Sequence, residues 1–135
     1  MSLAGGQVLV TGATGFLGGT LALRLAQAGV QVDALARRPQ KAGFIRQQPN
    51  ITVVAGDITD AERMKQVMQG CSIVFHVAAA LGGNLEKQHH INVDGTRNIM
   101  LAAAGAKVER VVHVSSIAVY GYHYNGDITE DFEQK

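Results

Sequence analysis

The chain has only one cysteine, Cys71, among its 135 residues, so it cannot form a disulfide bond within itself. A lone thiol suits the reducing cytoplasm, and we expect Cys71 to be a small buried apolar side chain rather than a nucleophile. Apolar runs are only a few residues long, far short of a membrane span, and the first residues lack the basic start and apolar core of a signal peptide. We therefore expect a cytoplasmic protein with no membrane partner.

Charge is also scarce, because charged residues make up 17% of the chain and the formal net charge is +1. This balance predicts no surface for nucleic acid. No metal site is expected: His89 and His90 would point about 100° apart on a helix, and neither they nor His76 have a supporting cluster of cysteines or carboxylates. With 47% hydrophobic residues, the chain is predicted to be one globular domain, or a part of one, over residues 1–135.

Short β-branched runs alternate with longer helical patterns. Strands are predicted at 7–11, 30–36, 51–55, 72–77 and 110–115, and helices at 16–28, 40–47, 60–69 and 85–104. Nearly continuous apolar strands indicate a sheet covered on both faces, and the alternation indicates parallel crossovers. The prediction is an α/β fold, a Rossmann-type doubly wound parallel sheet.

The polar sequence after residue 121 supplies no helix to cover the fifth predicted strand. We therefore expect a sheet truncated after about five strands. The apolar face that is exposed on the fifth predicted strand would then pack against the rest of the full-length protein or be buried in a homodimer.

The most informative motif is the glycine-rich turn at residues 11–18, Thr-Gly-Ala-Thr-Gly-Phe-Leu-Gly, directly after the first predicted strand. A strand–turn–helix junction of this kind directs free backbone N–H groups and a helix dipole at one point. The pyrophosphate of a dinucleotide fits there. Gly12 permits the sharp turn, Gly15 a close approach of the ligand, and Gly18 close packing of the helix on the strand.

The second predicted strand ends in Arg37 and Arg38, with no carboxylate at its tip. In this fold the tip lies beside the adenosine ribose, where an acidic residue would bind the 2′-hydroxyl of NAD. Two guanidinium groups favour the 2′-phosphate of NADP instead, and the alternative is that both are solvated loop side chains. Asp33 lies too early in the strand to reach the ribose.

The third and fourth strand ends carry further candidates. Asp57, after the third strand, either accepts a hydrogen bond from the adenine amine or only shapes the turn before a helix capped by Asp60. Val77, Ala78 and Ala79, after the fourth, are small enough to leave room for the ribose and phosphates, or they simply pack at a helix start.

Ser115 and Ser116 end the fifth predicted strand, where hydroxyls face the crevice expected for nicotinamide and substrate. A serine there can bind a substrate oxygen and share in proton transfer, although strand-end capping is the alternative. A hydrolase is not expected, because no G-x-S-x-G motif is present. Asn92, inside the fourth predicted helix, is expected to bond a neighbouring strand's backbone.

Together these motifs resemble the extended short-chain dehydrogenase/reductase family, the NAD(P)-dependent epimerases and dehydratases. The matching segments are 11–18, 56–60, 75–79, 92–98 and 114–121, in the family's order and spacing. The resemblance implies that Ser116 matches the catalytic Ser/Thr and that the amides of Phe16 and Leu17 bind pyrophosphate. It also places Thr14, Ile58 and Ser115 at the cofactor. The two arginines after the second strand make NADP the expected cofactor rather than NAD.

The family's catalytic Tyr-x-x-x-Lys is absent, because no lysine stands four residues after Tyr120, Tyr122 or Tyr124. In the family this motif lies beyond the position of residue 135. We therefore expect the full-length protein to be an oxidoreductase, epimerase or dehydratase acting on a sugar nucleotide, ketone or other small hydroxylated substrate. This portion alone should lack turnover. The alternative is a non-catalytic NADP(H)-binding sensor or scaffold.

Overall fold

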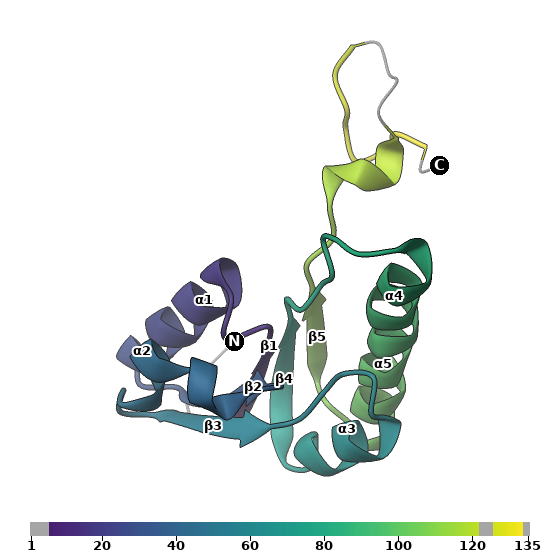
Figure 1. Ribbon diagram of the computed structural model, residues 1–135. Helices are drawn as coiled ribbons and strands as arrows, with labels where there is room; N and C mark the ends of the chain where they lie inside the picture. Colours follow the sequence, from purple (N-terminus) through teal and green to yellow (C-terminus); the bar gives the residue numbers. More distant parts are fainter. Residues whose placement is uncertain (1–5, 122–125, 134–135) are drawn as a thin grey trace.

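A computed structural model of the chain describes residues 6–121 and 126–133 (Figure 1). Its strands form one parallel sheet in the order β3-β2-β1-β4-β5. The strands are β1 Gln7–Thr11, β2 Gln31–Ala36, β3 Ile51–Ala55, β4 Cys71–His76 and β5 Arg110–His113. This order confirms the predicted Rossmann-type α/β fold, and the direction of winding reverses between β1 and β4.

Helices cover both faces of the sheet. Helices α1 (Phe16–Gln27) and α2 (Gly43–Arg46) lie on one side, and α3 (Ala61–Val67), α4 (Leu85–His89) and α5 (Gly95–Gly105) lie on the other (Figure 1). The strands contribute side chains to an apolar core on each face of the sheet, because successive side chains of a strand point to opposite faces. Val8 and Val10 belong to the core cluster under α1, whereas Leu9 belongs to the one under α3 and α5.

The predicted strands match closely, but two predicted helices do not. In place of a helix over 40–47 there is a 3₁₀ turn, η1 (Pro39–Lys41), followed by the four-residue α2. In place of one helix over 85–104, α4 and α5 are separated by the π-helical segment η2 (His90–Asp94). Within η2, the Asn92 side chain bonds the loop after β4 and not a strand, contrary to expectation: its amide donates to the Ala80 oxygen at 3.0 Å and accepts from the Ala80 nitrogen at 2.7 Å.

The helix-start and cysteine predictions are confirmed. Asp60 caps α3 by accepting a hydrogen bond from the Arg63 amide at 2.9 Å. Cys71 is buried, its thiol lies 3.4 Å from the Val67 oxygen, and burial, followed by the charge of Asp33, raises its pKa to about 11. A thiol held protonated in this way is a core side chain rather than a nucleophile.

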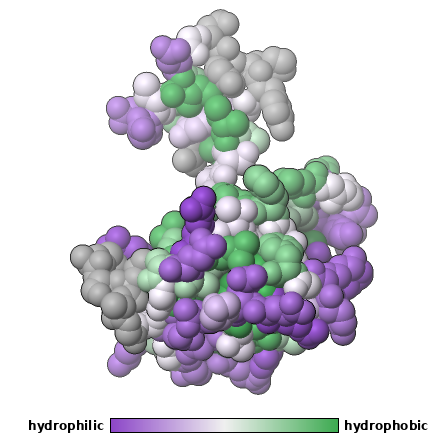
Figure 2. Space-filling view, turned by 90° about the vertical axis from the view of Figure 1, so that its left-hand side faces the viewer, coloured by the Kyte–Doolittle hydropathy of each residue, from purple (hydrophilic) through white to green (hydrophobic). Residues whose placement is uncertain are grey.

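Strand β5 ends at His113, two residues earlier than predicted. Ser116 then begins the 3₁₀ turn η3 (Ile117–Tyr120), and η3 and residues 126–133 stand clear of the sheet and its helices, joined to them by a narrow neck (Figures 1 and 2). Val112 in β5 and Val114 just after it are 37% and 42% exposed, so the described residues leave apolar surface uncovered at this edge of the sheet. Over residues 6–121 and 126–133, no helix has the length and apolar character needed to cross a membrane.

Candidate dinucleotide site

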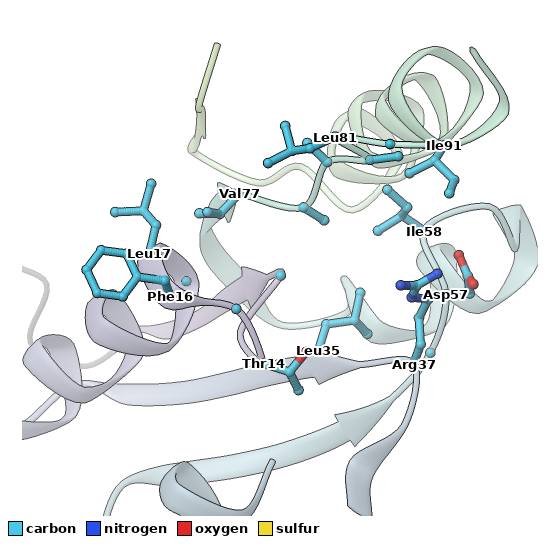
Figure 3. Close-up of a pocket in the computed structure, with 18 of the residues that line it drawn as sticks. Thr14, Phe16, Leu17, Leu35, Arg37, Asp57, Ile58, Val77, Leu81 and Ile91 are labelled. Atoms are coloured by element: carbon cyan, nitrogen blue, oxygen red, sulfur yellow. The ribbon is translucent and has the colours of Figure 1, made fainter. Parts of the chain in front are cut away.

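A cavity of about 590 Å³ opens at the carboxyl ends of β1, β2, β3 and β4 (Figure 3). It includes the point where the direction of winding reverses, which is where open parallel sheets bind ligands. The structure gathers twelve of the predicted cofactor residues around it: Gly12, Thr14, Gly15, Phe16, Leu17, Gly18, Arg37, Asp57, Ile58, Val77, Ala78 and Ala79. Segments far apart in the sequence therefore form one site.

The glycine-rich turn has the close packing that its sequence predicts. Gly12 has a φ of 68°, and a Cβ atom there would lie 2.9 Å from the Ala78 nitrogen. The Gly15 amide donates to the Gly12 oxygen at 2.9 Å and closes the turn. A Cβ atom on Gly18 would lie 2.3 Å from the same oxygen, so the first turn of α1 rests directly on the loop. A side chain at Gly12 or Gly18 would therefore collide with these backbone atoms.

The N-terminus of α1 is open to an anion. Asp60 caps α3 and Asn84 caps α4 through their side chains, whereas α1 begins after Gly15, has no side-chain cap and carries no acidic residue in its first turn. The first amides of a helix have no partner inside the helix, and the helix dipole is positive at this end. The amides of Phe16 and Leu17 therefore suit a phosphate group.

Arg37 lies at the other end of the cavity from Phe16 and Leu17, close to Asp57 (Figure 3). Arg38 is exposed and does not line the cavity, so the structure brings only one of the two predicted arginines to the site. Asp33 is also outside it: its carboxylate accepts a hydrogen bond from Gln7 at 2.6 Å, and burial raises its pKa. No acidic side chain of β2 therefore faces the cavity.

Asp57 shapes its turn and also lines the cavity. Its Oδ1 accepts hydrogen bonds from the amide and the hydroxyl of Thr59 at 3.0 and 2.9 Å. None of the contacts between the described residues engages Oδ2. The turn-shaping role is therefore observed, and one carboxylate oxygen remains for the predicted contact with adenine.

Seven lining residues were not assigned to the site from the sequence: Leu35, Gly56, Ala80, Leu81, Gly82, Lys87 and Ile91. Most lie in the loop after β4 or in the helices that follow it. The signal was the run of alanines and glycines after β4, which leaves the sheet at the same edge as the glycine-rich turn. Lys87 adds a cation to the wall formed by this loop.

Ser115 and Ser116 do not line this cavity. They face a second one together with Tyr120 and residues of the segment that stands clear of the sheet. The Ser116 hydroxyl accepts a hydrogen bond from the Ala118 amide at 3.2 Å, so it caps η3 and not the end of β5. The catalytic role of Ser116 and the cofactor contact of Ser115 stay predictions. Tyr122 and Tyr124 lie outside the described residues.

A buried polar cluster lies beneath the cavity, between β1, β4 and α5. Thr11 and His76 are both 0% exposed. The Thr11 hydroxyl lies 2.8 Å from His76 Nδ1, and the Thr96 hydroxyl lies 2.9 Å from His76 Nε2. His113 stacks on His76 with ring centroids 5.1 Å apart. Burial, followed by the proximity of His113, lowers the pKa of His76 to about 4, so its imidazole is neutral at pH 7.

Comparison with known proteins identifies the class to which this fold and site belong. Residues 8–135 match the NAD dependent epimerase/dehydratase family, and the chain belongs to it. The resemblance inferred from the motifs is therefore confirmed.

Two curated relatives are reductases. A putative dihydroflavonol 4-reductase of Synechocystis is 39% identical over 128 residues, which cover 93% of this chain and 37% of that protein. A 2-alkyl-3-oxoalkanoate reductase of Shewanella oneidensis is 38% identical over 113 residues, which cover 82% of this chain and 28% of that protein. The chain thus spans only about a third of the length of these relatives.

A solved structure shows the same fold. A short-chain dehydrogenase/reductase superfamily protein of Agrobacterium tumefaciens with bound NAD superimposes with a TM-score of 0.83 at 28% identity, over 96% of this chain and 39% of that one.

Proposed function

We propose that this chain is the dinucleotide-binding part of an NADP-dependent reductase that acts on the carbonyl group of a small molecule. The observation that carries the proposal is the cavity that joins the uncapped start of α1 to Arg37 across the carboxyl edge of the sheet. One end supplies backbone amides for a pyrophosphate, and the other supplies a guanidinium for a further phosphate.

Different residues of the cavity would bind different parts of the cofactor. The amides of Phe16 and Leu17 would bind the pyrophosphate, Asp57 Oδ2 would accept a hydrogen bond from adenine, and Arg37 would bind the 2′-phosphate. When bound, the reduced cofactor supplies a hydride to the substrate carbon. The names of the two reductase relatives support carbonyl reduction as the reaction, and the small side chains of the loop after β4 leave space beside the cofactor.

The preference for NADP is tested by titrating NADPH and NADH and following cofactor fluorescence. Replacing Arg37 with alanine removes a charge-assisted contact of about 1.5–3 kcal/mol, so NADPH should bind roughly 10- to 100-fold more weakly and NADH should be unaffected. Arg38→Ala is the matched control, because Arg38 is the adjacent arginine and does not line the cavity. Equal affinities for NADPH and NADH that Arg37→Ala leaves unchanged would refute the role of Arg37 in selecting NADP.

The proposed reaction is tested by the oxidation of NADPH with a panel of ketones in a form of the protein that includes Tyr-x-x-x-Lys. Ser116→Ala should lower kcat about 100-fold or more, the usual contribution of a positioned proton-transfer group, and Ser116→Thr should restore most of it. A complete reading frame without Tyr-x-x-x-Lys would favour the non-catalytic sensor. The homodimer and the cytoplasmic location also stay predictions.

A further inference from the structure

The Thr11 hydroxyl makes more contacts than its oxygen can accept. The amides of Val77 and Ala78 both donate to it, each at 3.1 Å, and His76 Nδ1 lies 2.8 Å away. A hydroxyl has two acceptor positions and one hydrogen. Backbone amides can only donate, so they occupy both acceptor positions. The hydroxyl hydrogen must therefore be donated to His76 Nδ1.

This donation determines the tautomer of His76. Because Nδ1 accepts, the single proton of the neutral ring lies on Nε2, which then donates to the Thr96 hydroxyl at 2.9 Å. A second proton on Nδ1 would leave the Thr11 hydroxyl without an acceptor. Within residues 6–121 and 126–133, the ring contacts Thr11 from β1, Thr96 from α5 and His113 from β5, and none of these partners is a carboxylate.

The cluster joins the two walls of the cofactor cavity at the point where β1 and β4 separate. Thr11 precedes Gly12 on one wall, and Val77 and Ala78 form the other. Contact between these walls is close enough that a Cβ atom on Gly12 would lie 2.9 Å from the Ala78 nitrogen. We infer that His76 is a positioning residue whose neutral Nε2–H tautomer, through Thr11, holds the glycine-rich turn and the loop after β4 at the spacing that the dinucleotide requires.

The tautomer is tested in the wild-type protein without any ligand, by two-bond ¹H–¹⁵N correlation spectra of the imidazole at pH 7. The inference expects a protonated Nε2 and an unprotonated Nδ1 for His76. A proton on Nδ1, in either the neutral or the charged ring, would overturn it. This measurement does not depend on the proposed function or on any variant folding.

The positioning role is tested by two variants of Thr11, one that removes the hydroxyl and keeps the size of the side chain and one that keeps the hydroxyl. Thr11→Val removes the hydroxyl, so hydrogen exchange at the Val77 and Ala78 amides should accelerate about tenfold. Thr11→Ser restores the hydroxyl and should restore the protection. Thr96→Val is the control on the far side of the ring, and it should leave these two amides protected. Unchanged exchange in Thr11→Val would refute the role.

The link to the cofactor rests on the proposed function and has its own measurement. Thr11→Val should weaken NADPH binding about tenfold, and Thr11→Ser should recover it. If the wild-type protein does not bind NADPH, the proposed function fails, whereas the spectra and the exchange rates still decide the inference about His76. If NADPH binds and Thr11→Val binds it equally well, the spacing is not controlled by this cluster.

Discussion

Lowering the pH should destabilise this domain through His76, and the structure gives the sign and the size of the effect. The pKa of His76 is lowered from an ordinary value of 6.5 to about 4, mainly by burial and secondarily by His113. Between these two values the unfolded chain binds a proton that the folded chain does not. The free energy of unfolding therefore falls as the pH is lowered through this window, and the stability from the neutral ring is fully present only above it.

The difference between the folded and unfolded pKa values corresponds to about 3 kcal/mol of stability at pH 7 that is lost by about pH 4. For a domain that is stable by about 5–15 kcal/mol, this loss is a substantial fraction. Other groups titrate in the same range, so the contribution of His76 has to be isolated by comparison with a variant.

The assay is urea unfolding followed by circular dichroism from pH 7 to pH 4, in the wild-type protein and in His76→Asn. His76→Asn should be less stable than the wild type at pH 7. Between pH 7 and pH 4 its free energy of unfolding should fall by about 3 kcal/mol less than that of the wild type. His89→Asn is the matched control, because the His89 side chain is 66% exposed. Parallel pH profiles for the wild type and His76→Asn would refute the reasoning.

Three further substitutions test the fold around the site. Gly18→Ala should lower the free energy of unfolding in urea by about 1–3 kcal/mol and abolish NADPH binding, because its Cβ atom would overlap the Gly12 oxygen. Gly105→Ala is the control, because a Cβ atom there would meet no atom within 4 Å beyond the neighbouring backbone. Asp60→Ala removes the cap of α3 and should cost about 1 kcal/mol in thermal unfolding, so an unchanged Tm would contradict the capping role. Ile99→Ala leaves a cavity in the fully buried core between α5 and the sheet and should cost about 2–5 kcal/mol in urea unfolding, whereas a cost below about 1 kcal/mol would mean that the site collapses.

Most of the cofactor cavity could be predicted from the sequence because it follows from strand ends. In a parallel sheet the carboxyl ends of all strands lie at one edge, so residues placed just after a strand share that edge whatever their separation in the chain. Arg37, Asp57 and Val77 each satisfy this condition, and all three line the cavity. Arg38 satisfies it as well but lies outside, because position after a strand does not specify the direction of a side chain.

The remaining features depend on contacts between distant segments. Helical periodicity over residues 85–104 gives no sign of the π-helical segment, where Asn92 bonds a loop residue twelve positions earlier. Similarly, His76 has the pattern of a core residue on a buried strand. Its partners Thr11 and Thr96 come from β1 and α5, so the hydrogen-bonding role of the ring becomes visible only when the three segments are assembled.

A chain with a net charge of only +1 can form a site suited to a polyanionic dinucleotide because its positive groups are local to that site. The attraction is concentrated at the ligand, in the amides at the start of α1 and in the cations Arg37 and Lys87 on the cavity wall. A buried charge beneath the turn would carry a desolvation cost. The neutral hydrogen bonds of Thr11 and His76 hold the two walls together without that cost, and binding energy can then come from backbone groups that are already in position.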